Sequence, residues 1–385
     1  MRSQTFIPRD YDVFSGLDVD KRSISVTFTD HNGFLKSLRM PYSVEHLLNH
    51  VRKHFPNQKV AFVYEAGPTG YGLYDGIVAQ SYPCLIAAPS MIPKAPGQRV
   101  KTNRLDSKAL SESLRGGQLK SIHVPSGVYR ELRHLTQLRD VLVSELVGMK
   151  QRIKSLLLFE GIEFPPAPPG SQWSSIVKNK LRKLACSGPV RFKLDQLLDS
   201  LEFNEKQVLK TITEIRRFCR KDPELSQCIE YLMSLPGIGW IVASQLLARI
   251  GDWRELDNIR QLGGFLGLAP TEHSTGERVD RGSITRTGDE RLRSKVIQAS
   301  WSAIRQDNEL REFFRAVCRK HPRAVASRVA IVAVARKLSV RIAVVLMEQR
   351  PYEVREKVHS APLTQEETSP QGTTRREPEA GEKNS

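Results

Sequence analysis

The 385-residue sequence has no apolar run of about 18 residues, and its first residues lack the apolar core of a signal peptide. We therefore expect no transmembrane helix, no membrane partner and a cytoplasmic location. Cysteine is also scarce: five are present, an odd number at wide spacing and without a Cys-x-x-Cys pair. This spacing argues against a disulfide framework or a zinc site and predicts reduced, mostly buried thiols.

Acidic residues are too few to balance the basic ones. The chain has 59 Lys and Arg against 42 Asp and Glu, which gives a net charge of +17. Such an excess favours a polyanionic partner, most simply DNA or RNA. A basic protein that is merely soluble is the alternative that charge alone leaves open. The length predicts two or three domains with a substantial core.

Residues 1–120 show apolar and alternating segments that predict strands, followed by alternating helices and strands. Asn32-Gly33 is a favoured hairpin turn, and Ser43 is placed to cap a helix. Three antiparallel strands followed by helix–strand units predict an α/β domain of ribonuclease H-like layout. The expected strands are 14–19, 23–29, 34–39, 60–64 and 85–88.

Acidic side chains stand at the ends of two predicted strands. Asp18 ends the first strand, and Glu65 follows the strand 60–64. A carboxylate on a central strand is costly unless a positive group lies beside it. Asn103 and Asp106 are three residues apart at the start of a predicted helix, so both can face the sheet. These oxygen ligands predict a site for one or two Mg²⁺ ions; ordinary turn acids are the alternative.

Residues 121–222 predict two long helices. A first helix from Pro125 to about Glu160 carries apolar residues at intervals of three or four, which is typical of a coiled coil. A proline-rich stretch at 164–170 interrupts it, and a second helix with the same pattern follows. The sequence between the apolar seams is rich in Arg and Lys. It is compatible equally with a dimerising, nucleic-acid-lined stalk and with a plain intramolecular hairpin.

Residues 223–350 predict a mainly helical domain, and residues 351–385 a polar, disordered tail. The segment 235–239, Leu-Pro-Gly-Ile-Gly, is typical of a helix-hairpin-helix motif, whose backbone amides can face a phosphate; a tight helix–helix turn is the alternative. A loop rich in glycine, hydroxyl groups and arginine follows at 263–293, and it could bring a nucleophile to a phosphate. The predicted DNA-binding residues are Gly237, Gly239, Arg278, Arg281, Arg286, Arg291 and Arg293.

The segments 16–19, 63–66 and 100–106 resemble the acidic motifs of the "one-ten" family of bacterial insertion-sequence transposases. The first domain of that family is similar to the Holliday-junction resolvase RuvC. The resemblance implies Mg²⁺ held by four acids, here Asp18, Glu65, residue 103 and Asp106. The chain departs from the pattern because Asn103 offers an amide oxygen without charge. Either the metal binds more weakly or this copy is impaired; our hypothesis is that the site works.

The loop at 263–293 is similar to the second domain of the same family, which carries a catalytic serine that bonds covalently to DNA. The pair Ser274-Thr275 stands at this place, so the resemblance implies Ser274 as the nucleophile, with Thr275 as the alternative. It also implies a homo-oligomer, a dimer or a tetramer, that contacts RNA through its coiled coil. The resemblance further implies that this RNA is a structured non-coding guide that pairs with donor and target DNA.

We therefore predict a DNA transposase or recombinase of a bacterial insertion sequence, associated with the nucleoid. Two other functions stay open. A metal-dependent junction nuclease would use water and would not need Ser274. A non-catalytic nucleic-acid-binding relative would bind with a steep salt dependence and never cut, and the neutral Asn103 keeps this alternative open.

Overall fold

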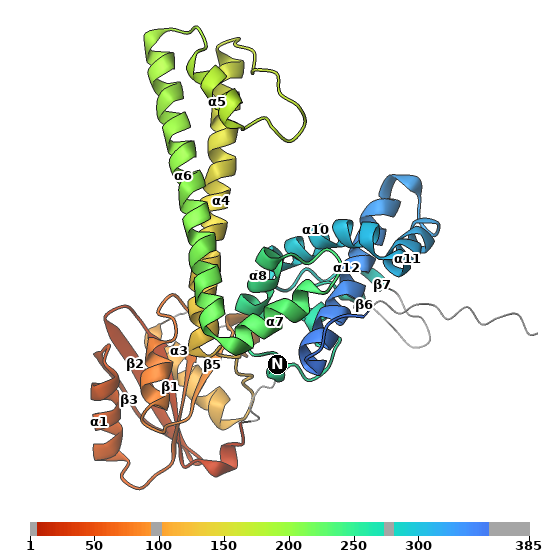
Figure 1. Cartoon of the computed structure of the whole chain (residues 1–385). Helices are drawn as coiled ribbons and strands as arrows, with labels where there is room; N and C mark the ends of the chain where they lie inside the picture. Colours follow the sequence, from red (N-terminus) through yellow and green to blue (C-terminus); the bar gives the residue numbers. More distant parts are fainter. Residues whose placement is uncertain (1–5, 94–101, 273–280, 354–385) are drawn as a thin grey trace, which may run out of the picture. The chain divides into compact units, whose positions relative to one another are not determined.

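Five strands form a mixed sheet in the first part of the chain (Figure 1). The computed structural model describes residues 6–93, 102–272 and 281–353. The strand order is β3-β2-β1-β4-β5, in which β1 lies antiparallel to β2 and parallel to β4. All five predicted strands are confirmed, with small shifts of their ends: β1 Val13–Val19, β2 Ser23–Asp30, β3 Gly33–Pro41, β4 Val60–Glu65 and β5 Cys84–Ala87.

Helices cover both faces of this sheet. On one face, α1 and α2 share an apolar core with Leu17 and Tyr64; on the other, α3 packs through Leu110 and Leu114. Ser43 caps α1 as predicted, because its hydroxyl accepts a hydrogen bond from the amide of His46 at 3.2 Å. The elements are η1 Pro8–Asp10, α1 Val44–His54, α2 Gly72–Val78, η2 Pro89–Met91 and α3 Asn103–Arg115.

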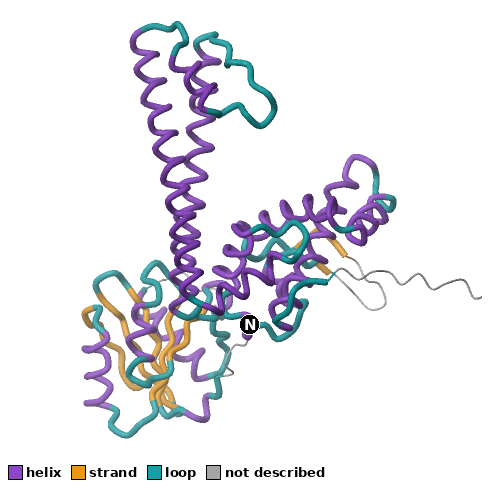
Figure 2. The backbone as a smooth tube through the Cα atoms, in the orientation of Figure 1, coloured by secondary structure: helices purple, strands orange, loops and turns teal. Residues whose placement is uncertain are grey.

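Two long helices, α4 and α6, then pair as an antiparallel hairpin (Figure 2). Their seam buries Leu132 against Ile215 near one end and Ile153 against Leu198 near the other. The two ends of the apolar stripe are thus buried inside a single chain, as the hairpin alternative proposed, whereas Leu138 farther along α4 is 49% exposed. Pairing between two chains stays a prediction. The short α5 between them was not predicted. The helices are α4 Gly127–Phe159, α5 Ser175–Arg182 and α6 Gly188–Lys221.

The remaining elements form a largely helical region around α12, the helix predicted near 324–346. Ala335, Leu338 and Ile342 of this helix are fully buried. In the described part of the chain, no helix is long and apolar enough to cross a membrane. The elements are α7 Pro223–Met233, α8 Trp240–Ile250, η3 Trp253–Glu255, α9 Gln261–Phe265, β6 Pro270–Glu272, β7 Arg281–Ile284, α10 Glu290–Gln306, α11 Asn308–Cys318 and α12 Arg323–Glu348.

A buried carboxylate joins α11, α12 and the segment that follows α12. Asp307 accepts hydrogen bonds from the Leu310 amide at 2.8 Å, from Arg341 Nη1 at 2.8 Å and from the Tyr352 hydroxyl at 3.0 Å. Burial alone would raise the pKa of Asp307. The hydrogen bonds and the Arg341 charge outweigh burial and hold this pKa below its ordinary value. Asp307 therefore contributes stability only while it is ionised.

We predict that Asp307→Asn lowers the free energy of unfolding at neutral pH by about 2 kcal/mol, because its charge-assisted hydrogen bond with Arg341 is weakened while Glu309, 2.7 Å from Arg341 Nη2, still pairs with this guanidinium. The folded-state pKa lies below the unfolded one, so the wild-type advantage is present above about pH 4 and is lost as the pH falls through the folded-state pKa. Urea unfolding over a pH series should show the two proteins converging in acid.

Glu348 offers a matched control, because its ion pair with Arg350 is about half exposed, at 49% and 50%. Glu348→Gln should change the free energy of unfolding by less than about 1 kcal/mol. A gap between wild type and Asp307→Asn that stays constant from neutral to strongly acidic pH would contradict the assignment.

Candidate functional site

Asp18 and Glu65 stand at the same end of two neighbouring parallel strands. The register pairs Leu17 of β1 with Tyr64 of β4, and each acid is the next residue along its strand. Neighbouring strands lie about 4.8 Å apart, so the two backbones are adjacent at this edge. Asp18 is half-buried and Glu65 is exposed.

Both side chains belong to the face of the sheet that α3 covers. Side chains alternate between faces along a strand, so Asp18 shares the face of Gly16, which lies directly under α3. Glu65 shares the face of Val63, whose side chain lies in the core cluster that contains Leu110 of α3. The register and the pleat together place Asp18 and Glu65 at one edge and on one face of the sheet.

Gly16 lets α3 lie against the backbone of β1. A Cβ atom at this position would fall 2.1 Å from the carbonyl oxygen of Ser107 and 2.4 Å from the amide nitrogen of Ser111. Hydroxyl pairs fix the same contact: Ser107 with Thr27 at 2.8 Å and Ser111 with Thr29 at 2.7 Å, all four buried. Such fully satisfied buried polar contacts hold the helix in one position on the sheet.

The first turn of α3 carries the remaining predicted ligands. Thr102 caps the helix by accepting a hydrogen bond from the amide of Leu105, and Asp106 is half-buried one turn in. The amide nitrogen Nδ2 of Asn103 donates to Asp20 Oδ2 at 2.7 Å. Because Asp20 comes two residues after Asp18, this bond brings the start of α3 to the acidic end of β1. The positive end of the helix dipole adds further stabilisation for carboxylates there.

These residues fit a hard divalent cation by their chemistry and by their placement at one edge. Carboxylate and amide oxygens are the ligands that Mg²⁺ prefers. In the described part of the chain, no three His, Cys, Asp or Glu side chains lie together as a ready-made set of metal ligands.

The two glycines of the predicted helix-hairpin-helix motif, Gly237 and Gly239, differ from each other in their surroundings. Gly237 has a positive φ of 79°, and a Cβ there would meet the carbonyl oxygen of Ala299 in α10 at 2.3 Å. Its amide donates to the side chain of Gln306 at 3.1 Å, so packing and this bond account for the glycine. A Cβ at Gly239, before α8, would meet no atom within 4 Å, which leaves room for a ligand.

The arginines predicted to bind DNA also differ from one another in their surroundings. Arg293 is buried, and its Nη1 donates to the carbonyl oxygens of Leu266 at 3.0 Å and Arg286 at 3.4 Å, so it braces the loop. Arg286 and Arg291 are exposed. The antiparallel pair β6 and β7 flanks the segment that carries the predicted nucleophile. Ser274, Thr275 and Arg278 lie outside the described residues, as does the side chain of Arg281.

A basic patch lies at the end of α6, within the stretch that the sequence shows to be rich in Arg and Lys, although its individual residues were not singled out. Its residues line a cavity of about 440 Å³. The Arg216 guanidinium lies 5.2 Å from the ring centroid of Trp240, which connects the patch to the start of α8 near Gly239. Exposed cations beside an aromatic ring favour contact with a nucleic-acid backbone. The residues of the basic patch are Thr213, Arg216, Arg217, Arg220 and Lys221.

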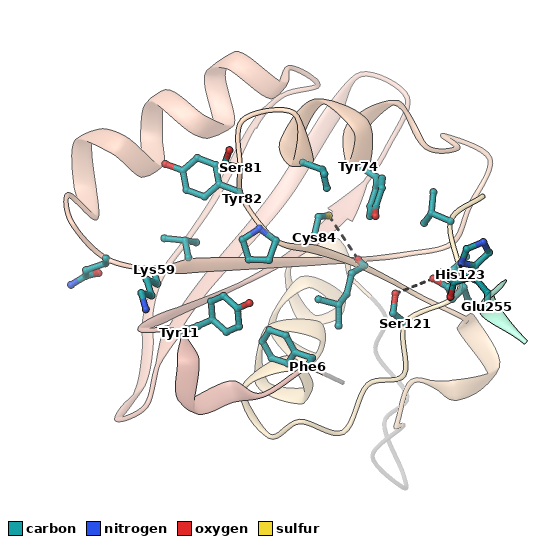
Figure 3. Close-up of a pocket in the computed structure, with 17 residues that line it drawn as sticks. Phe6, Tyr11, Lys59, Tyr74, Ser81, Tyr82, Cys84, Ser121, His123 and Glu255 are labelled. Atoms are coloured by element: carbon teal, nitrogen blue, oxygen red, sulfur yellow. Dashed lines mark hydrogen bonds and ion pairs between the residues drawn. The ribbon is translucent and has the colours of Figure 1, made fainter. Parts of the chain in front are cut away.

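A second cavity, of about 870 Å³, lies along the first half of β5 (Figure 3). Its lining includes Lys59 and Val60 at the start of β4 and Cys84 at the start of β5. Asp18 and Glu65 stand at the opposite ends of their strands. This cavity is therefore separate from the candidate metal site.

Comparisons with known proteins match both parts of the chain that carry the predicted site residues. A family model described as "Transposase IS116/IS110/IS902 family" matches residues 229–315, and a transposase model of the DEDD, IS110 type matches residues 15–160. The predicted transposase y4qE of Sinorhizobium fredii is 31% identical over 298 residues, which cover 76% of this chain and 72% of the relative.

Two further relatives are more distant. The transposase of insertion sequence element IS1328 from Yersinia enterocolitica is 26% identical, over 65% of this chain and 73% of its own length. The pilin gene-inverting protein of Moraxella bovis is 26% identical, over 47% of this chain and 55% of its own length.

We predict that Gly16→Ala destabilises the protein by several kcal/mol, since a methyl group cannot fit between β1 and α3 without moving the helix. Displacement of α3 would also move Asn103 and Asp106 away from the strand ends. Thermal unfolding should show a clear drop in midpoint. Gly148→Ala in α4 is the matched control, because its Cβ meets nothing within 4 Å and alanine favours a helix. Equal stability of the two variants would show that the Gly16 contact is unimportant.

Proposed function

We propose that this chain, which belongs to the IS116/IS110/IS902 family of transposases, cleaves and rejoins DNA strands with Mg²⁺ at the edge of its N-terminal sheet. Asp18, Glu65 and Asp106 would hold the metal as charged ligands, with Asn103 as a neutral one. Bound there, Mg²⁺ would supply Lewis-acid stabilisation of the charge that develops on a phosphate.

The register of β1 and β4 is the observation that carries the proposal. It makes Asp18 and Glu65 neighbours at one edge, on the face where α3 begins. The strand order β3-β2-β1-β4-β5 also supports the predicted ribonuclease H-like, RuvC-like layout. Ordinary turn acids would have no reason to occupy matching positions of neighbouring strands, on the same face of the sheet and beside the start of a helix.

Ser274 is the proposed nucleophile. Its hydroxyl oxygen attacks a phosphorus atom of DNA, the bond from that phosphorus to one strand's oxygen breaks, and this oxygen takes a proton. A DNA hydroxyl later attacks the phosphoserine, which rejoins a strand and restores the serine. The covalent link conserves the energy of the phosphodiester bond. The relative named as a pilin gene-inverting protein supports such a scheme, because inversion requires that every cut strand be rejoined.

The partners follow from charge and from the family. DNA would lie against exposed cations of the basic patch, against Arg286 in the loop after β7 and against Arg291 in the first turn of α10. Our proposal includes a structured guide RNA and a homo-oligomer, a dimer or a tetramer. Both rest on the family resemblance, and the net charge of +17 is compatible with the RNA.

The test is a covalent adduct. The protein, purified together with any RNA that it retains, is incubated with Mg²⁺ and a labelled plasmid that carries the DNA flanking its own gene. On a denaturing gel we expect a protein–DNA adduct that is absent with EDTA, absent in Ser274→Ala and retained in Thr275→Ala. Sequencing of the retained nucleic acid should give one defined non-coding RNA.

The variants separate the alternatives. Asp18→Asn should lose both cleavage and the adduct, because it removes a metal ligand before the covalent step. Cleavage without any adduct would support the nuclease that uses water. Salt-dependent binding without cleavage would support the non-catalytic relative. An adduct that persists in Ser274→Ala would exclude Ser274 as the nucleophile.

A further inference from the structure

The cavity along the first half of β5 combines aromatic rings, an open strand edge and a lysine (Figure 3). We propose that it binds one unpaired nucleobase, hydrogen-bonded to the edge of β5 and flanked by aromatic side chains, with the attached phosphate at Lys59. The base belongs either to a free nucleotide or to an unpaired position of a bound nucleic acid. This inference does not depend on the metal site, because the cavity lies at the opposite end of β4 from Glu65.

The first argument is the open edge of β5. On its inner side β5 pairs with β4, where the Phe62 amide donates to the carbonyl oxygen of Pro83 at 2.9 Å. Backbone groups of successive residues point to opposite sides of a strand, so the amide and the carbonyl of Cys84 face away from β4. Cys84 lines the cavity, and its backbone therefore offers one hydrogen-bond donor and one acceptor there.

This open edge is too short for a further strand. The Ile122 amide donates to the carbonyl oxygen of Ile86 at 2.7 Å, and Ala87 forms a bridge with Ser121. Among the described residues, this closes the second half of β5 and leaves Cys84 as the open part of the edge. An added peptide strand gains affinity from a ladder of main-chain hydrogen bonds, which one residue cannot supply. One donor and one acceptor instead match the edge of a single unpaired base.

Aromatic rings lie on both sides of this edge. Tyr74 and Tyr82 pack against the core on the face that α1 and α2 cover. Phe6 and Tyr11 pack against the core on the α3 face, and their rings are stacked with centroids 5.0 Å apart. The hydrogen bonds of a strand lie in the plane of its sheet, so a base bonded to Cys84 continues that plane and turns its two faces to these rings. Stacking on aromatic rings stabilises a bound base of any type.

The size and the charges of the cavity fit one nucleotide. Its volume is about 870 Å³, within the range of about 300–1,000 Å³ that is typical of small-molecule sites. Lys59 lies at one end of the cavity and Glu255 at the other, where its Oε2 atom is 3.7 Å from His123 Nδ1 (Figure 3). A phosphate is therefore attracted to the Lys59 end and repelled from the Glu255 end.

The test is equilibrium dialysis of the full-length protein, freed of nucleic acid, against radiolabelled AMP or adenosine. EDTA is present, so the candidate metal site takes no part. Tyr11→Leu should weaken the binding of both ligands by about tenfold, because a stacking ring is lost while the side chain stays apolar. Lys59→Gln should weaken the binding of AMP by about fivefold and leave that of adenosine unchanged, because only AMP carries the phosphate.

Two substitutions outside the cavity are the matched controls. Tyr42 is a partly buried tyrosine that packs on the core of the same sheet but does not line the cavity. Lys53 is exposed in the last turn of α1. Tyr42→Leu and Lys53→Gln should both bind AMP and adenosine as the wild type does.

A second measurement separates the two sources of the base. It compares a DNA duplex that has one unpaired adenine with the same duplex fully paired. If the base belongs to a nucleic acid, the wild type prefers the first duplex by about tenfold and Tyr11→Leu loses this preference. Binding of AMP without such a preference assigns the cavity to a free nucleotide.

Two results would overturn the inference. One is a wild type that binds neither AMP nor adenosine and does not distinguish the two duplexes. The other is a Tyr42→Leu variant that binds AMP as weakly as Tyr11→Leu does, because the loss would then come from the core of the sheet and not from the cavity.

Discussion

The close contact between Gly16 and α3 is the constraint on which the site depends. A helix backbone within reach of a strand backbone requires a residue without a side chain, and β1 provides one two positions before Asp18. The buried hydroxyl pairs from Ser107 and Ser111 then hold the helix to β2. The chain between β5 and α3 is long, so these contacts, and not chain connectivity, bring Asp106 to the sheet.

The site also illustrates why acidic groups at a strand edge need support. Their mutual repulsion opposes a compact arrangement, while the start of α3 offers partial positive charge and the Asn103 amide offers a hydrogen bond. The same chain handles a buried acid differently at Asp307, where Arg341 and a hydroxyl group are permanent partners. Permanent partners suit a structural acid, whereas an acid that is to bind a cation has to keep part of its coordination open.

Much of the architecture could be predicted because it depends on local patterns. The apolar and alternating segments predicted the strands, Ser43 predicted the start of a helix, and the spacing of apolar residues predicted α4, α6 and α12. Asp18 and Glu65 could be singled out because each ends an apolar strand. What could not be predicted depends on packing between distant segments. Gly237 fits a DNA-binding motif in the sequence, yet its surroundings are α10 and Gln306, and Arg293 is buried against loop carbonyls. In the sequence Asp20 is an ordinary turn residue, and its hydrogen bond with Asn103 of α3 depends on how the helix packs on the sheet.

The central claim is that Asp18, Glu65 and Asp106 share a divalent cation at the end of β1 and β4. Crystals of the wild-type protein grown with Mn²⁺ would test it through the anomalous difference map. The account predicts a peak within ligand distance of these carboxylates. A map whose protein-bound peaks all lie elsewhere, with the three carboxylates apart, would contradict it.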